Sequence, residues 1–180
     1  MRHLIIPAPG DAVTGMPAEV QAPAVPPILV FPWGNPSRGD DAIGPRIEEL
    51  LGQRDLPGVE LLTDFQLQIE HVVDIEHRVC VVFVDASVSA TPPFEFAALQ
   101  SAADISYTTH AMSPQALMTV YQRVSRQNPP PCYLLSVRGY DFELGRPLSE
   151  AARQHADQAV EFLVGFIDKQ VAQLDTLDVK

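Results

Sequence analysis

The stretch PILVFPWGNPSRGDDAIGPRIEELLG, residues 27–52, decides the fold because its pattern predicts a strand, a loop and a helix in that order. The apolar run at residues 27–31 contains β-branched side chains and is typical of a strand buried on both faces. From Asp41 onward, apolar residues recur at helical spacing, and Gly52 lies where a helix would end. A strand followed by a helix is the first half of a parallel βαβ unit.

The next segments repeat this alternation. VELLTDF, residues 59–65, predicts a second strand, and QLQIEHVVDIEH, residues 66–77, predicts a second helix. VCVVFVDAS, residues 79–87, predicts a third and very apolar strand. Because crossovers between parallel strands are right-handed, the βαβαβ order predicts a parallel sheet with helices packed on its faces.

The second half of the chain completes the sheet. FEFAALQ, residues 94–100, follows two prolines and alternates in polarity, which favours an edge strand, and we expect it to run antiparallel. A helix is predicted from about Ser113, with Pro114 suited to its first turn. YLLSVRG, residues 133–139, predicts a fifth strand, and a long amphipathic helix is predicted to begin at Ser149.

The predicted fold class is therefore α/β. We expect a three-layer α/β/α domain around a doubly wound, mostly parallel sheet of about five strands, with one antiparallel edge strand. Residues 1–26 are rich in proline and are predicted to form an extension outside the fold. The domain proper is expected to span residues 27–172, and residues 173–180 are expected to form a C-terminal tail.

Bulk composition narrows the class of protein. A chain of 180 residues is of ordinary size for one domain. The formal net charge is -11 with no basic stripe, so nucleic acid is not expected as a partner. Cys80 and Cys132 lie in strand-like runs, which favours free thiols in a reducing compartment. No apolar stretch has the length of a signal-peptide core or a membrane span, so we expect a soluble, cytoplasmic protein without membrane contact.

Ionisable side chains follow the predicted strands. Asp40 and Asp41 come after the first strand, Asp85 ends the third, and His110 stands in the loop before the third helix. Because ligands of open α/β sheets gather at the carboxyl ends of the strands, we expect these side chains on one rim. Two carboxylates and one imidazole with open coordination positions suit a divalent transition metal such as nickel or zinc.

Each of these residues also has a purely structural interpretation. Asp40 or Asp41 could cap the helix that follows by accepting hydrogen bonds from free amides of its first turn. Asp85 could cap the turn after its strand, and His110 could be hydrogen-bonded to backbone. The remaining histidines are interpreted as tail or helix-surface residues: His3, His71, His77 and His155.

Several motifs resemble those of a known family. GNPSRGDDAIGPRIEELL resembles the G-N-x-x-x-x-D-[DE]-x-x-G opening of the hydrogenase maturation proteases, which remove the C-terminal tail of a nickel-iron hydrogenase large subunit. DFQLQIEHVVDI, VVFVDAS, THAMSP and SVRGYDFELG continue the match in the expected order, over about residues 27–170. The FQLQIEH and VRGYDFELG versions look most like the branch that serves the soluble NAD-reducing, or bidirectional, hydrogenases.

The resemblance implies which residues act. Asp41, Asp85 and His110 would bind the metal and carry the catalysis, although some family members place the histidine later, near Gln115. Asp40 would be a cap or a supporting partner that makes a local hydrogen bond. The loop that passes close to the incoming substrate would comprise Gly34, Asn35, Gly39 and Asp40.

The resemblance also implies the reaction. The metal would be nickel already loaded into the large-subunit precursor, so the precursor would be the partner and no organic cofactor would be needed. A water molecule would attack the scissile carbonyl, with His110 or Asp41 as the candidate base. We expect a monomer.

Two alternatives use the same architecture. A nickel-dependent maturation chaperone would bind the precursor without cutting it. A phosphoacceptor signalling domain would use its acids to hold magnesium, but that class expects a lysine after the last strand, where this chain has Arg138.

Overall fold

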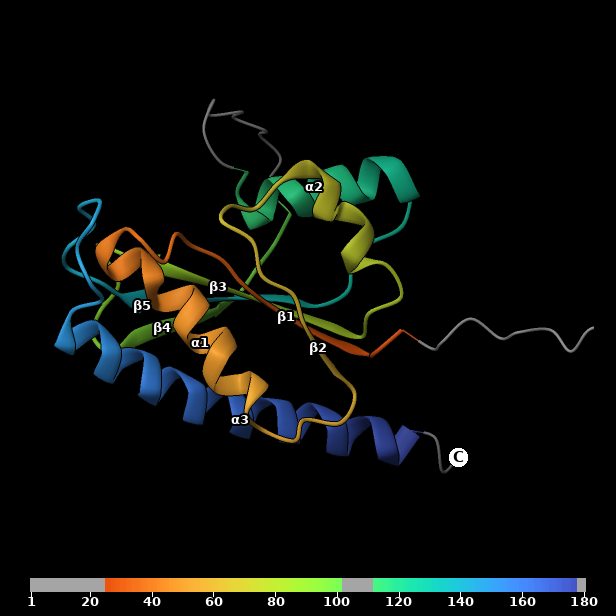
Figure 1. The fold of residues 1–180 in the computed structure, drawn as a ribbon. Coiled ribbons are helices and arrows are strands. Elements are labelled where there is room, and N and C mark those ends of the chain that lie inside the picture. The colour runs from red at the N-terminus through yellow and green to blue at the C-terminus, as the bar shows by residue number, and fades with distance from the viewer. Residues whose placement is uncertain (1–24, 102–111, 178–180) are drawn as a thin grey trace, which may run out of the picture.

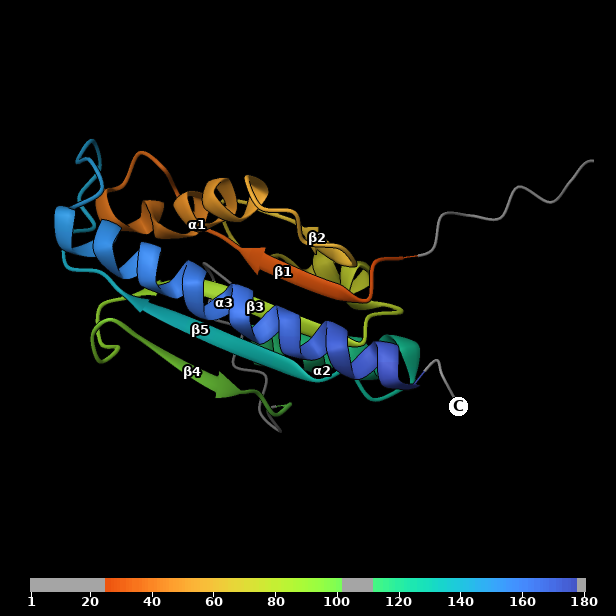
Figure 2. The same cartoon turned by 90° about the horizontal axis from the view of Figure 1, so that it is seen from below.

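The computed structural model describes residues 25–101 and 112–177, which form a five-stranded sheet between two helical layers (Figure 1). The strands are β1 (Ile28–Pro32), β2 (Val59–Leu61), β3 (Cys80–Ser87), β4 (Phe94–Ala98) and β5 (Cys132–Arg138). Their order is β2-β1-β3-β5-β4. All neighbours pair in parallel except β4, which runs antiparallel to β5 at the edge (Figure 2). The predicted α/β fold class, with its antiparallel edge strand, is confirmed.

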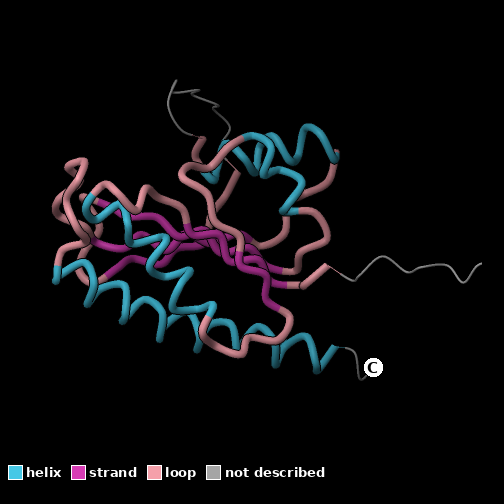
Figure 3. The backbone as a smooth tube through the Cα atoms, viewed as in Figure 1, coloured by secondary structure: helices cyan, strands magenta, loops and turns pink. Residues whose placement is uncertain are grey.

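Helices cover both faces of this sheet. On one face lie α1 (Ile43–Gly52) and α3 (Glu150–Leu177). On the other face lie α2 (Pro114–Ser125) and the short 3-10 helix η2 (Ile69–Ile75). Figure 3 shows the strands as a central layer between these two groups of helices.

The first strand is apolar throughout because both of its sides are covered. Ile28 and Val30 pack in the core beneath α1 and α3, whereas Leu29 and Phe31 pack in the core beneath α2. Each such side chain contributes about 1.5–3 kcal/mol when it is fully removed from water. The central strands are therefore held firmly, and the loops at their carboxyl ends project from a rigid base.

The second strand and the second helix are shorter than predicted. β2 has three residues instead of the span 59–65. Within the predicted helix 66–77, Leu67 and Ile75 are buried, but Ile69 is 49% exposed. Because the apolar residues do not form one continuous buried stripe, a single 3-10 segment anchored at both ends replaces the expected α-helix.

The limits of the described domain differ slightly from the expected ones. The carbonyl oxygen of Pro26 accepts a hydrogen bond from Arg78 Nη1 at 2.8 Å, so this residue of the expected extension contacts the domain. Helix α3 continues through residue 172 as far as Leu177. None of the described helices combines the length and the apolar character needed to cross a membrane.

Candidate active site

Asp41 and Asp85 lie near each other at the carboxyl ends of the parallel strands β1 and β3. We call this end of the sheet its carboxyl edge. β1 and β3 end side by side, since Pro32 pairs with Val84, and Asp85 is the next residue of β3. Asp41 returns to this edge because its Oδ2 accepts a hydrogen bond from the backbone N–H of Asn35 at 3.0 Å. The charge of Asp41 is close enough to raise the pKa of Asp85. The structure therefore brings two of the predicted ligands together.

The environment of Asp85 disfavours its charge. Burial raises its pKa, the negative charge of Asp41 raises it further, and the backbone N–H of Ala86 only partly opposes them, so the pKa of Asp85 rises to about 7. Within the described part of the chain, neither carboxylate takes part in an ion pair. A divalent cation beside two such carboxylates would relieve their repulsion, so the donor set suits a metal.

The third predicted ligand, His110, lies outside the described residues, and its position at this edge stays a prediction. Across residues 25–101 and 112–177, no group of three His, Cys, Asp or Glu side chains is gathered to hold a metal ion. The alternative histidine position, Gln115, lies in the first turn of α2. The described residues thus supply two carboxylates of the predicted site.

Two glycines explain why the loop closes on the start of α1. Gly34 has a φ of +148°, and a Cβ atom there would overlap the carbonyl oxygen of Asp41. A Cβ atom at Gly44 would overlap the carbonyl oxygen of Trp33. Only residues without a side chain permit these backbone contacts, and the contacts bring Asp41 back to the end of β1.

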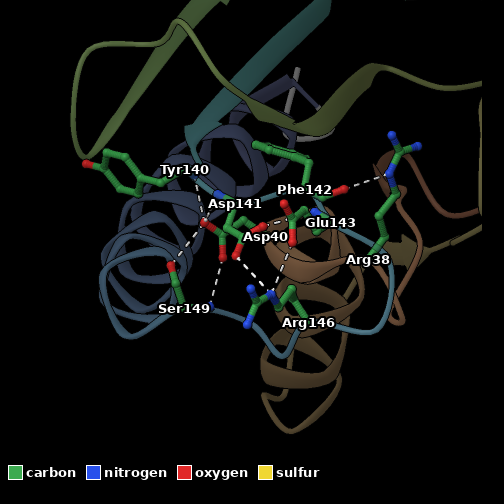
Figure 4. Close-up of polar contacts among 8 residues, drawn as sticks. All are labelled: Arg38, Asp40, Tyr140, Asp141, Phe142, Glu143, Arg146 and Ser149. Atoms are coloured by element: carbon green, nitrogen blue, oxygen red, sulfur yellow. Dashed lines mark hydrogen bonds and ion pairs between the residues drawn. The ribbon is translucent and has the colours of Figure 1, made fainter.

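Asp40 is fully buried, and its carboxylate binds a segment far away in sequence (Figure 4). Oδ2 accepts hydrogen bonds from the backbone N–H groups of Tyr140 at 2.7 Å and Asp141 at 3.1 Å, and from the hydroxyl of Ser149 at 3.0 Å. Oδ1 accepts a hydrogen bond from the N–H of Ser149 at 2.8 Å. Burial alone would raise the pKa of Asp40, but these hydrogen bonds outweigh it and hold the pKa below its usual value.

These contacts correct two interpretations of the acid pair. The 3-10 turn η1 (Gly39–Ala42) and helix α1 both begin without a side-chain cap, so the capping interpretation is wrong for Asp40 and Asp41. Asp40 was also expected in the substrate loop, yet its exposure is 0%, which leaves no surface for direct contact. Its partners lie 100 to 109 positions later in the chain, and no local pattern indicates such a separation.

A third carboxylate, Asp64, borders the same edge and was not among the predicted site residues. Its carbonyl oxygen accepts a hydrogen bond from the N–H of Gly34 at 3.1 Å, and its Oδ2 lies 3.4 Å from Nε2 of His71. His71 is therefore not a free helix-surface residue, and its ring packs edge-on against Phe31 with centroids 4.6 Å apart. The sequence could have indicated Asp64, because this acid lies near the end of the predicted strand VELLTDF, as Asp85 does in VCVVFVDAS.

A pocket of about 300 Å³ opens beside this edge. Concave, mostly apolar surfaces at the carboxyl ends of strands are common ligand sites in α/β proteins. It is lined by Gly34, Pro36, Pro45, Thr63, Asp64 and Phe65.

The fold and this edge define a class of protein: a doubly wound α/β domain with a carboxylate pair at the carboxyl ends of β1 and β3. No family model matches the chain, and no curated protein matches it. Among solved structures, the hydrogenase maturating endopeptidase HybD from E. coli is 26% identical with a TM-score of 0.64, over 79% of this chain and 93% of that one. This likeness supports the resemblance to the hydrogenase maturation proteases that the sequence motifs indicated.

Two further structures have the same fold. The [NiFe] hydrogenase maturation protease HycI from Thermococcus kodakarensis KOD1 has a TM-score of 0.62 at 21% identity, over 79% of this chain and 93% of that one. The hydrogenase 2 maturation peptidase from Thaumarchaeota archaeon SCGC_AB-539-E09 has a TM-score of 0.58 at 24% identity, over 78% and 97%.

Proposed function

We propose that this protein is an endopeptidase that removes the C-terminal extension of a nickel-iron hydrogenase large-subunit precursor after nickel insertion. The similar structure HybD is a hydrogenase maturating endopeptidase, which supports the reaction class. The single observation that carries the assignment to a site is the pair Asp41 and Asp85, both partly buried at the carboxyl edge and without a cationic partner among the described residues.

Nickel is part of the substrate in this proposal. Asp41, Asp85 and His110 bind the nickel that the precursor already carries, so binding reports completed insertion. One oxygen of Asp41, Oδ2, is held by Asn35, and the other has no hydrogen-bond partner among the described residues, which supports its availability to a cation. The nearby pocket offers room for a segment of the precursor chain.

The hydrolysis requires a water molecule and a proton transfer. The water oxygen bonds to the scissile carbonyl carbon, the carbon–nitrogen bond breaks, and the proton taken from the water ends on the leaving amine. Asp41 and His110 are the two candidate bases. Asp85 is the remaining proposed nickel ligand, and its pKa of about 7 lies above that of an ordinary carboxyl.

The phosphoacceptor alternative loses support at Arg138. Its Nη1 donates a hydrogen bond to the carbonyl oxygen of Ala90 at 3.3 Å, and its guanidinium lies over the ring of Tyr140, 5.0 Å from the centroid. The side chain is thus held by the β3–β4 connection and by Tyr140, whereas a signalling lysine needs to reach the phosphorylated acid.

The same proposal includes the type of hydrogenase, the oligomeric state and the compartment. The VRGYDFELG and FQLQIEH segments support a client of the soluble NAD-reducing, or bidirectional, type. The formal net charge of -11 supports action as a monomer. The thiols of Cys80 and Cys132, both buried and unpaired, support action in the cytoplasm.

The proposal is tested by incubating the protein with a purified, nickel-loaded large-subunit precursor and measuring the precursor's intact mass. The expected result is loss of the C-terminal extension, while the matched nickel-free precursor keeps its mass. A precursor that binds but stays intact would indicate the maturation chaperone instead. A precursor that neither binds nor shortens would contradict both functions.

A further inference from the structure

Two loops at the carboxyl edge of the sheet lie side by side and are bonded to each other along their length. We call residues 34–41 and 139–149 together the double loop. The N–H of Gly39 donates to the carbonyl oxygen of Arg146 at 3.0 Å, and the N–H of Gly145 donates to that of Ser37 at 2.7 Å. Nε of Arg38 also donates to the carbonyl oxygen of Phe142 at 2.9 Å (Figure 4).

The carboxylate of Asp40 lies at the centre of the double loop. Both of its oxygens are engaged, and every donor comes from residues 140–149. Ser149 extends this contact into α3, because its Oγ also accepts a hydrogen bond from the N–H of Ala152 at 3.2 Å. Asp40 therefore joins the first loop, the second loop and the start of α3.

Asp41 depends on the same loop for its position. Its N–H donates to the carbonyl oxygen of Arg38 at 3.1 Å, and its Oδ2 accepts from Asn35. The N–H of Arg38 in turn donates to the carbonyl oxygen of Asn35 at 3.0 Å. A shift of the first loop relative to the second would move Asn35 and Asp41 together.

We infer that Asp40 is a positioning residue for Asp41: by clamping the two halves of the double loop, it fixes the carboxylate that faces the substrate. Asp40 itself touches no substrate, since it has no exposed surface. The inference rests on the proposed function in taking Asp41 as the group that acts on the precursor. It assigns a reason for a second acid beside the ligand, which neither capping nor metal binding supplies.

We call Asp40 and the four groups that donate hydrogen bonds to it the clamp. These hydrogen bonds require a carboxylate at residue 40. Three backbone N–H groups and one hydroxyl converge on Asp40, and an ionised carboxylate is an acceptor at both oxygens. Asparagine has the same size but only one acceptor oxygen, and its NH₂ group would face N–H donors. Asp40→Asn thus loosens the double loop without changing the shape of residue 40.

The experiment compares Asp40→Asn with Ile167→Ala in the full chain. Ile167 is a buried residue of α3, roughly 27 Å along the helix from Ser149, so its truncation lowers stability without touching the double loop. Amide hydrogen exchange is measured well below both melting temperatures. Asp40→Asn is expected to speed exchange at the N–H of Asn35, which reports the Asp41 bond, by about tenfold or more, and Ile167→Ala by less than about twofold.

Kinetics of precursor processing provide the second readout. Asp40→Asn is expected to lower kcat with KM changed less than about twofold, because Asp40 positions a reacting group and binds no substrate. If Asp40→Asn does not fold, Ser149→Ala removes one donor and keeps the carboxylate, and smaller changes in the same direction are expected.

Unchanged Asn35 exchange together with unchanged kcat in these variants would overturn the positioning role. Absence of processing by the wild-type protein would instead be a failure of the proposed function, and the exchange measurement would still decide whether Asp40 holds Asp41.

Discussion

Two glycines of α1 differ in what lies beside their Cα atoms. A Cβ atom at Gly44 would overlap the carbonyl oxygen of Trp33, whereas nothing lies within 4 Å of a Cβ atom at Gly52. We expect Gly44→Ala to cost about 2 kcal/mol or more through strain, and Gly52→Ala to be neutral or to stabilise by up to about 1 kcal/mol. Chemical denaturation of both variants checks this. Equal midpoints would show that Trp33 does not approach the start of α1 as described.

The neighbouring acids also differ in their contribution to stability. Asp40 was expected to make only a local hydrogen bond, but it satisfies buried N–H groups of the second loop. We expect Asp40→Asn to lower the free energy of unfolding by about 2–4 kcal/mol and Asp41→Asn by less than about 1 kcal/mol. Urea unfolding at neutral pH measures both. A larger loss of stability in Asp41→Asn than in Asp40→Asn would contradict the proposal that Asp40 joins the two loops.

At the scale of elements, the two cysteines lie on adjacent strands but on opposite faces. Val81, not Cys80, pairs with Cys132, and the two thiols accordingly belong to different cores. Burial raises the pKa of Cys80 to about 12, and burial followed by the influence of Cys80 raises that of Cys132 to about 12.

Both thiols should therefore resist alkylation. We expect negligible labelling by iodoacetamide at pH 8 in the folded protein and complete labelling in guanidinium chloride, because the thiolate is the reacting species. Mass spectrometry counts the labels. Rapid labelling of either cysteine, or a disulfide between them, would contradict the two-faced arrangement of β3 and β5.

Elements defined by their own residues were predictable from sequence. The apolar runs of β1 and β3 match strands with both faces buried, and α2 follows Ser113, whose Oγ accepts a hydrogen bond from Ala116 N–H. Features defined by distant partners were not predictable. The clamp at Asp40 joins residues 109 positions apart, and η2 departs from its helical pattern because the neighbouring layer buries only part of it.

At the scale of the whole molecule, the point at which the folded domain begins to need its N-terminal residues can be tested by deletion. Residues 1–26 were predicted to form an extension outside the fold, and their proline-rich composition offers little apolar surface to bury. The Pro26 carbonyl nevertheless accepts from Arg78, and the Pro27 carbonyl accepts from the N–H of Val79 at 2.7 Å. We expect deletion of 1–24 to leave the melting temperature unchanged and deletion of 1–27 to lower it.

Thermal melts of the two truncated proteins measure this difference. Each lost backbone contact is worth about 1 kcal/mol, and for a domain of this size that corresponds to about 2–4 °C. A large loss of stability on deleting 1–24 would show that the extension packs against the domain.

In the proposed function, Asp41 acts on the nickel-loaded precursor. The most direct measurement is the intact mass of that precursor after incubation with wild-type protein and with Asp41→Asn, alongside melts of both proteins. Asparagine keeps the size of the side chain but removes the anionic donor that a divalent ion prefers. We predict that the wild type removes the C-terminal extension and that a normally folded Asp41→Asn leaves the precursor at full mass. Complete cleavage by a folded Asp41→Asn protein would contradict a role of Asp41 in binding the nickel.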